Sequence, residues 1–303
     1  MNQIDKRGAR YGVLCGIAAY GSWGIFPLYF KTVAGVSPVE VLAHRAVWSF
    51  VMLAVLAGLL GRWRELWREL HSRRLLAMLM LSTLFIAANW LTFIYAVTSG
   101  QVLQASLGYF INPLVNVLLG ILFLGERLRP RQTLSIGLAL AGVLLLTALV
   151  GELPWVALAL ALTFSLYALM RKLMPVDGFL SLTVETLVMA PLGLAYLGCL
   201  AAASGRETLG LGTVGLLMLS GPITTVPLLF FGAAARRLRL STMGILQYLS
   251  PTLQFLLAVV AFGEPFSRAQ LLSFACIWAA VLIYALDSLS AARPFPAAII
   301  EPD

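Results

Sequence analysis

Residues 102–124 read VLQASLGYFINPLVNVLLGILFL, a run that contains no charged side chain. The hydrocarbon core of a bilayer is about 30 Å thick, and a helix needs roughly 20 apolar residues to cross it. The run therefore predicts a transmembrane helix. Within it Tyr109, Asn112 and Asn116 are spaced i, i+3 and i+7, so these three polar side chains share one helix face.

The rest of the sequence contains nine more apolar runs of similar length. Together with 102–124, the ten runs cover residues 11–31, 39–60, 75–97, 102–124, 132–150, 154–171, 179–200, 210–235, 240–262 and 269–289. The chain is 60% hydrophobic and only 11% charged, whereas soluble domains are roughly a quarter charged. We expect an all-α membrane protein with ten transmembrane helices, whose solvent is the lipid bilayer.

The basic residues give the helices a direction. Most of the 21 lysines and arginines fall in connections on one side of the predicted membrane, and the other side holds only Lys31, Arg206 and Arg268. Because Lys and Arg accumulate in cytoplasmic loops, both termini are predicted to be cytoplasmic. The net charge of +8 thus reflects topology. No basic patch interleaved with aromatic residues indicates a nucleic-acid partner.

The two halves of the sequence repeat each other. Pro113, Gly125 and Glu126 recur with the same spacing at Pro251, Gly263 and Glu264, and Gly108 matches Gly244 if two residues of slack are allowed. Five helices are an odd number, so the second half must enter the membrane from the opposite side, as in the inverted repeats of secondary transporters. We predict a cytoplasmic tail over 1–10, a first repeat over 11–150, an inverted second repeat over 154–289 and a cytoplasmic tail over 290–303.

The polar stripe is repeated too, because Tyr109, Asn112 and Asn116 correspond to Gln247, Ser250 and Gln254. In lipid, such a stripe faces protein or a water-filled cavity. A mid-helix proline frees a carbonyl in each stripe. One interpretation is packing between helices, but two matched stripes favour a binding site in which Tyr109, Asn112, Gln247 and Ser250 donate or accept hydrogen bonds.

Charged side chains also fall inside the predicted spans. His44 and Arg45 lie in the outer part of the second span, and Glu185 lies in the seventh at the position that corresponds to Arg45. A buried charge is costly in lipid, so each is expected to face a polar cavity or a partner. For Arg45 the alternative is that its long stem reaches the outer headgroups. Glu185 has no such stem and is the candidate coupling residue, holding a substrate cation or a proton.

Several aromatic and amide side chains lie too deep for an interfacial belt. We predict that Trp23, Asn89, Trp90 and Tyr248 form walls of the same pocket. By contrast, the connection over 61–74, GRWRELWRELHSRR, carries Trp63, Leu66, Trp67 and Leu70 at helical spacing and predicts an amphipathic helix at the membrane surface. The three cysteines are unpaired in spacing and the chain has two histidines, so we expect no disulfide framework, metal site or cofactor.

With these features the chain resembles a known family, the EamA-type transporters of the drug/metabolite transporter superfamily. Within that family it resembles the RarD subfamily. The resemblance covers about residues 12–289. It rests on YGSWGIFPLYFK at 20–31, HRAVWSF at 44–50, ANW at 88–90, SLGYFINP at 106–113, VET at 184–186 and QYLSP at 247–251. It implies a ten-helix inner-membrane permease with a central cavity built from both halves.

These observations favour a secondary transporter that moves a small organic metabolite or an amphipathic drug-like molecule by alternating access. In that interpretation Arg45 attracts an anionic group and Glu185 a cationic group or a proton. The alternatives are an intramembrane enzyme, for which no HExxH or GxSG motif is present, and a membrane sensor or scaffold that transports nothing. The sequence leaves a monomer and a weak homodimer open.

Overall fold

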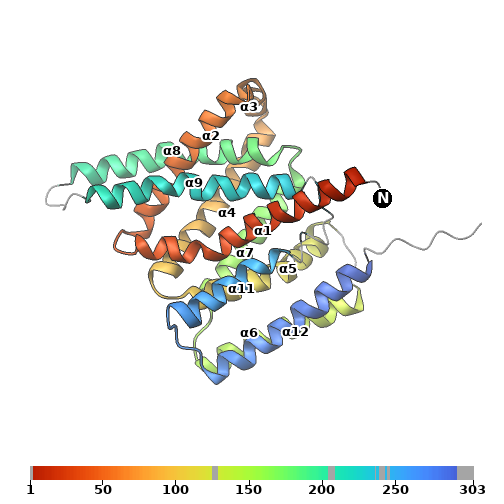
Figure 1. Ribbon diagram of the computed structural model, residues 1–303. Helices are drawn as coiled ribbons and strands as arrows, with labels where there is room; N and C mark the ends of the chain where they lie inside the picture. Colours follow the sequence, from red (N-terminus) through yellow and green to blue (C-terminus); the bar gives the residue numbers. More distant parts are fainter. Residues whose placement is uncertain are drawn as a thin grey trace, which may run out of the picture.

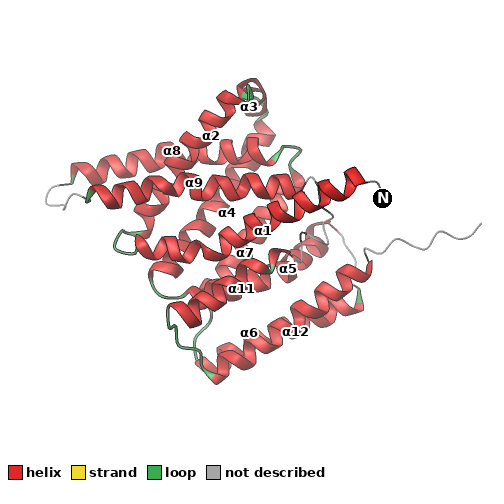
Figure 2. Ribbon diagram, in the orientation of Figure 1, coloured by secondary structure: helices red, strands yellow, loops and turns green. Residues whose placement is uncertain are grey.

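The computed structural model describes residues 3–124, 129–203, 209–235, 237, 238, 243 and 246–291, and these residues are almost entirely helical (Figures 1 and 2). No strand occurs among them. The helices are α1 (Gln3–Thr32), α2 (Pro38–Leu59), α3 (Trp63–Leu70), α4 (Arg73–Thr98), α5 (Val102–Leu124), α6 (Pro130–Val150), α7 (Trp155–Leu173), α8 (Gly178–Ala202), α9 (Leu211–Ala235), α11 (Leu249–Leu256), the π-helical turn η1 (Leu257–Ala261) and α12 (Arg268–Ala291).

Polar side chains fix the starts of three of these helices. The Ser37 hydroxyl accepts a hydrogen bond from the Glu40 amide at the start of α2, and Ser72 accepts from the Leu75 amide at the start of α4. Asp177 begins α8 in the same way. Such N-caps satisfy backbone amides that have no partner inside the helix. These three polar residues therefore fix where α2, α4 and α8 begin.

Within the described residues, nine helices are long and apolar enough to cross a membrane, and the segment Leu249–Ala261 is a shorter apolar helix. The predicted runs are thus confirmed as helices, the run 240–262 only over Leu249–Ala261. Helix α1 begins at Gln3 instead of near Tyr11. Helix α9 runs unbroken through Pro222 and Pro227.

The ninth run differs from a single kinked helix. Tyr248 is a turn residue that directly precedes α11, and Pro251 lies in the first turn of α11. Proline is tolerated in a first turn because the amide it lacks would have no partner there. Pro251 therefore follows a helix break, whereas Pro113 lies inside the continuous helix α5.

The amphipathic connection forms α3 as predicted. Leu66 is almost fully buried against α4 and α8, in a cluster with Leu75, Leu79, Leu180 and Val184. The indole of Trp67 is 60% exposed, as expected of a side chain that meets lipid headgroups. Helix α3 lies at one edge of the bundle (top of Figure 1).

The helix contacts follow a symmetric pattern. Helix α1 packs on α9 and α11, α2 on α8 and α9, α4 on α7 and α8, α5 on α7 and α11, and α6 on α12. If α1, α2, α4, α5 and α6 are exchanged with α7, α8, α9, α11 and α12 in order, each of these contacts maps onto itself or onto another of them. Helix α1 begins and α12 ends on the same side of the bundle (right in Figure 1).

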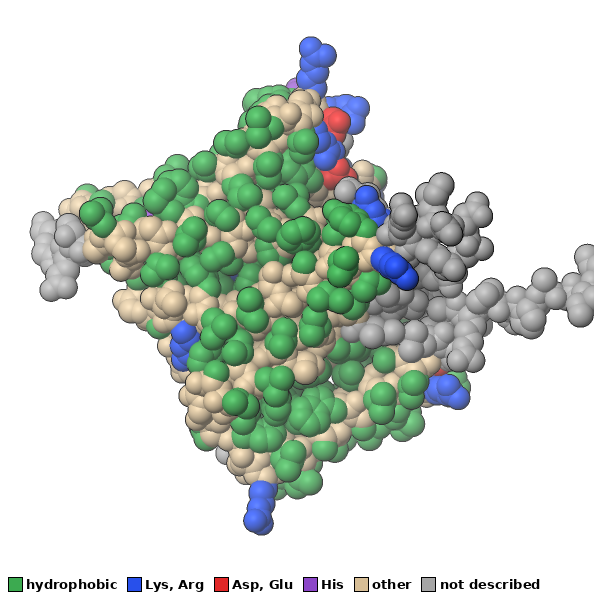
Figure 3. Space-filling view, viewed as in Figure 1, with side chains coloured by type: hydrophobic (Ala, Val, Ile, Leu, Met, Phe, Trp, Pro, Cys, Tyr) green, Lys and Arg blue, Asp and Glu red, His purple; other side chains and the backbone are tan. Residues whose placement is uncertain are grey.

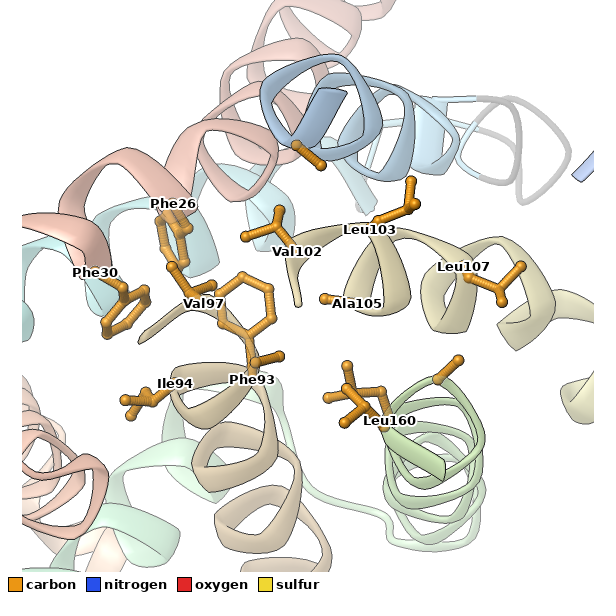
Figure 4. Close-up of a cluster of buried hydrophobic side chains, with 14 of the residues drawn as sticks. Phe26, Phe30, Phe93, Ile94, Val97, Val102, Leu103, Ala105, Leu107 and Leu160 are labelled. Atoms are coloured by element: carbon orange, nitrogen blue, oxygen red, sulfur yellow. The ribbon is translucent and has the colours of Figure 1, made fainter. Parts of the chain in front are cut away.

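The largest hydrophobic cluster lies where α1, α4, α5 and α7 meet. Figure 4 shows Phe26 and Phe30 of α1 facing Phe93 and Ile94 of α4, with Leu160 of α7 beneath α5. The rings of Phe30 and Phe93 are 5.8 Å apart in an edge-to-face arrangement, which is favourable for aromatic pairs. This core joins helices of both halves.

The outer surface is apolar. Figure 3 shows hydrophobic side chains over the middle of the face and basic side chains at its edges. Many leucines on this surface are exposed, among them Leu122, Leu192 and Leu211 at 74%, 71% and 93%. In water an apolar surface of this extent would cause aggregation. It is the surface expected of a protein that lipid surrounds.

Candidate functional site

Arg45 of α2 is buried between the two halves, in what we call the Arg45 cluster: Arg45, Trp90, Thr224, Phe26 and Phe30. The residue is only 4% exposed. Its Nε donates a 2.8 Å hydrogen bond to Oγ1 of Thr224 in α9. Its guanidinium carbon lies 4.0 Å from the ring centroid of Trp90 in α4, within the range of a cation–π interaction. Arg45 therefore points into the bundle and does not reach for the headgroups.

A glycine allows α2 and α9 to approach closely at this point. A Cβ built on Gly221 would lie 2.6 Å from both the carbonyl carbon and the carbonyl oxygen of Trp48. Only glycine fits so close to a backbone. The short distance from Arg45 to Thr224 depends on this crossing, because Gly221 is one helical turn from Thr224.

Glu185 of α8 is the centre of a second buried group, the Glu185 cluster: Glu185, Ser82, Ser181, Tyr167 and Arg171. Its Oε1 accepts from the hydroxyls of Ser82 at 2.7 Å and Ser181 at 3.1 Å. Its Oε2 accepts from the Tyr167 hydroxyl at 3.4 Å, and Nη1 of Arg171 lies 3.9 Å from Oε1. Helices α4, α7 and α8 are thus joined through one fully buried carboxylate.

The two clusters correspond to each other in the two halves. Arg45 lies about 10 Å along α2 from its first residue, and Glu185 lies the same distance along α8, at 1.5 Å per residue. Their hydroxyl partners also correspond, because Ser82 lies on α4 and Thr224 on α9, two helices that the symmetric contacts exchange. Each charged side chain is therefore hydrogen-bonded to a hydroxyl of the opposite half.

The first polar stripe is partly assembled. The Asn89 amide donates to the carbonyl of Leu160 and to the hydroxyl of Thr163, at 3.1 Å each. The Tyr109 hydroxyl donates to Oδ1 of Asn89 at 3.4 Å. Asn112 is 1% exposed, and its Oδ1 has no hydrogen-bond partner among the described residues. Asn112 is thus a buried acceptor near the middle of α5.

The second stripe is built around Gln254. Its Nε2 donates to the carbonyl of Trp23 at 3.1 Å and to the Ser250 hydroxyl at 3.3 Å. The ring of Tyr248 stacks on Phe110 with centroids 6.5 Å apart, and the Tyr248 hydroxyl is buried without a hydrogen-bond partner in the described part of the chain. Gln247 is half-buried just before the helix break. Trp23 packs edge-on against Tyr20.

The predicted site residues therefore form separate groups. Arg45 and Trp90 contact each other, and Asn89 and Tyr109 do so as well, but Glu185 belongs to its own cluster and does not pair with Arg45. His44 is half-buried one position before Arg45. Glu264 accepts from the amides of Val102 and Leu103 at 2.8 Å each, so it caps α5. Gly125, Glu126 and Gly244 of the repeat lie outside the described residues.

The sequence interpretation missed the hydroxyl and cationic partners. The candidates did not include Thr224, Ser82, Ser181, Tyr167 or Arg171. The sequence carries one signal for two of them, because the hydroxyl pairs Ser82-Thr83 and Thr224-Thr225 are 142 residues apart, close to the 140 between Arg45 and Glu185. The partners of Glu185 on α7 carry no comparable signal, because they meet it only through helix packing.

On the side of the bundle where the chain begins, Arg62 links the α2–α3 turn to the start of α8. It forms ion pairs with Asp177 and Glu65, and its guanidinium lies 5.2 Å from the Phe179 ring centroid. Burial raises the pKa of Asp177, but the hydrogen bonds from Arg62 and from the amides of Leu180 and Phe179 outweigh it and hold that pKa below its ordinary value.

Neither a metal cluster nor the apolar groove along α6 coincides with these groups in the described part of the chain. Within the described ranges, no three His, Cys, Asp or Glu side chains are grouped as a metal ion would require. An apolar groove of about 600 Å³ follows α6 and is lined by Pro130, Thr133, Leu134, Gly137, Leu138 and Ala141. It contains none of the candidate residues.

Comparison with known proteins places the chain in a family. Residues 10–148 match the EamA-like transporter family. The chain is 46% identical to an uncharacterized transporter of Vibrio cholerae, over 95% of this chain and 96% of that protein. It is 44% identical to the protein RarD of Escherichia coli, over 96% of this chain and 99% of that protein. A crystal structure of a protein 21% identical in sequence superposes with a TM-score of 0.60, covering 93% of this chain and 99% of that one.

Apolar helices with polar groups buried between two halves define a multi-pass membrane protein of the transporter class. With relatives of this identity over nearly its whole length, the chain belongs to the RarD subfamily of the EamA transporters.

Proposed function

We propose that this protein is a secondary transporter of the inner membrane that moves a small organic metabolite or an amphipathic drug-like molecule by alternating access. In this proposal the moving parts are the repeats 11–150 and 154–289, inverted relative to each other, and both termini are cytoplasmic. The basic connections support that orientation. The symmetric contacts of the ten helices support the repeat. We assign no enzymatic step to the chain.

The pair of corresponding hydrogen bonds carries the proposal. The hydrogen bond from Arg45 to Thr224 joins α2 to α9, and the hydrogen bond from Ser82 to Glu185 joins α4 to α8. Inverted repeats exchange conformations between inward-open and outward-open states. Each bond lies about 10 Å from the start of α2 or α8, and these helices start on opposite sides in the proposed topology. We infer that each bond closes one side, and that one breaks while the other persists.

The burial of the polar residues fits an occluded conformation. Arg45, Asn89, Asn112 and Glu185 are exposed by 4%, 2%, 1% and 0%. A substrate bound near Asn89, Tyr109 and Asn112 would be shielded from both sides. Opening of either side is then needed for the substrate to enter or leave.

Glu185 is the group through which a proton gradient would act. As a carboxylate it accepts three hydroxyl hydrogen bonds and faces Arg171. Protonation would remove its attraction to Arg171 and weaken the charge-assisted bond from Ser82. The contact between α4 and α8 would then loosen. In this proposal, proton binding favours opening on the cytoplasmic side.

Flux into liposomes tests the proposal. Purified protein should move members of a panel of amino acids, sugars, nucleosides and antibiotics, and a pH gradient should change the rate. Glu185→Gln should abolish the response to the gradient, because the amide cannot titrate. Glu152→Gln, the same substitution in an exposed connection, is the matched control. Undiminished, gradient-dependent flux in Glu185→Gln would contradict the assigned role. No flux of any compound would contradict the transport function itself.

A further inference from the structure

The guanidinium of Arg45 is buried with most of its hydrogen-bonding capacity unused. Arginine has five N–H donors. One, on Nε, reaches Thr224 at 2.8 Å. The four on the terminal nitrogens have no acceptor among the described residues. The residue as a whole is only 4% exposed, so protein surrounds most of this side chain.

The surroundings of this fork are aromatic and carry no counter-charge. Trp90 lies at 4.0 Å, Phe30 at 5.6 Å and Phe26 at 5.9 Å from the guanidinium carbon. None of the described carboxylates lies within ion-pair distance of Arg45.

A buried cation of this kind is stabilised by an anion that fits its geometry. The planar fork of arginine binds a carboxylate through two parallel hydrogen bonds. Glu185 cannot supply that carboxylate, because its oxygens are held by Ser82, Ser181 and Tyr167. None of the described carboxylates is thus available, and an anion from outside the chain can take this place.

We propose that Arg45 binds the carboxylate of an organic monoanion whose apolar part lies among the aromatic rings of the Arg45 cluster. This inference rests on the proposed transport function and names the class of substrate. One cation matches one negative charge, whereas a phosphate monoester carries nearly two. An amino acid fits less well, because no described carboxylate pairs with its ammonium group beside Arg45.

Ligand-induced thermal stabilisation of the full-length protein in detergent tests the inference. The probes are phenylacetate, benzoate and hexanoate, with phenylacetamide as the neutral analogue, phenethylamine as the cationic one and phenyl phosphate as the dianion. We expect at least one carboxylate to raise the unfolding temperature, and its effect to exceed those of the other three compounds. Equal stabilisation by phenylacetate and phenylacetamide, or no stabilisation by any carboxylate, overturns the inference.

Two variants locate the effect. Arg45→Gln should lose the stabilisation. Arg129→Gln, which removes the same charge from a half-exposed side chain paired with the buried Asp287, should keep it. A carboxylate that still stabilises Arg45→Gln overturns the assignment to Arg45. If Arg45→Gln does not fold, the comparison of carboxylate with amide on the unaltered protein decides.

The same probes in liposomes separate this inference from the transport function. Flux of neutral or cationic compounds without carboxylate binding would contradict the inference and leave the transport function standing. Carboxylate binding that requires Arg45, without flux of any compound, would support the inference and contradict the transport function.

Discussion

Gly221 lies where α9 crosses α2, and alanine at this position has no room for its methyl group. The added Cβ would be 2.6 Å from the Trp48 carbonyl, and ordinary contact begins at 3.4 Å. Because the obstacle is backbone, the two helices must separate by roughly 0.8 Å to restore normal contact. The hydrogen bond from Arg45 to Thr224, now 2.8 Å long, would be stretched beyond its normal range.

The expected cost follows from these two effects. Overpacking costs about 1–3 kcal/mol, and loss of a hydrogen bond to a charged group costs about 1.5–3 kcal/mol. Alanine in a helix recovers about 0.5–1 kcal/mol relative to glycine. Gly221→Ala should therefore lower the free energy of unfolding by about 2–5 kcal/mol. A loss of about 2 kcal/mol, the lower end of this range, corresponds to a fall in Tm of about 4–8 °C.

Thermal unfolding in one detergent measures the difference. Gly215→Ala, on the same helix, is the control, since no atom lies within 4 Å of its added Cβ, and its Tm should be equal or higher than that of the original protein. If Gly221→Ala and Gly215→Ala unfold at the same temperature, the α2–α9 crossing is not as close as described and the reasoning fails.

Three further predictions concern other contacts. The pKa of Asp177 is held below its unfolded value of about 3.9. Its contribution to stability is therefore present above about pH 4 and is lost as the pH falls through the folded pKa. When Tm is measured against pH, the Tm of Asp177→Asn should fall less steeply on acidification than that of the original protein. Glu264→Gln should cost about 0.5–2 kcal/mol because it removes a charged cap from α5, and an unchanged Tm would argue against the cap. Ser82→Ala should lower the free energy of unfolding by about 1–3 kcal/mol, more than the loss of about 0.5–1.5 kcal/mol expected for Ser106→Ala. The reason is that Ser82 donates to a carboxylate, whereas Ser106 donates to the carbonyl of Pro251. Equal losses of stability in the two variants would contradict a charged Glu185.

The sequence was sufficient to predict the helices because the bilayer imposes one simple requirement. Each apolar run of about 20 residues must satisfy its own backbone, and only a helix does so within a single segment. Even the run interrupted by Pro222 and Pro227 is helical. The correspondence of Arg45 with Glu185 was also visible, since the two halves repeat with nearly the same spacing.

The composition of the two clusters could not be predicted in the same way. Trp90 stacks on Arg45, and Arg171 approaches Glu185, because helices far apart in sequence cross at those points. Such crossings depend on where small residues permit close approach. Gly221 is the residue that permits one of them.

The break before α11 was missed for a related reason. Proline in an apolar run predicts a kink, but whether the helix bends or ends depends on the packing of its neighbours. The carbonyl of Pro251 accepts a hydrogen bond from Ser106, and the side chain of Gln254 bonds to α1. These contacts hold α11 between α1 and α5 and were not evident from the sequence.

Access to Asn112 from the two sides of the membrane tests the central claim most directly. The side chain is 1% exposed near the middle of α5. In a background with Cys15, Cys199 and Cys276 replaced by serine, Asn112→Cys would be treated with a membrane-impermeant thiol reagent in sealed vesicles of either orientation. Alternating access predicts labelling from both sides. Labelling from one side only, or from neither, would contradict it.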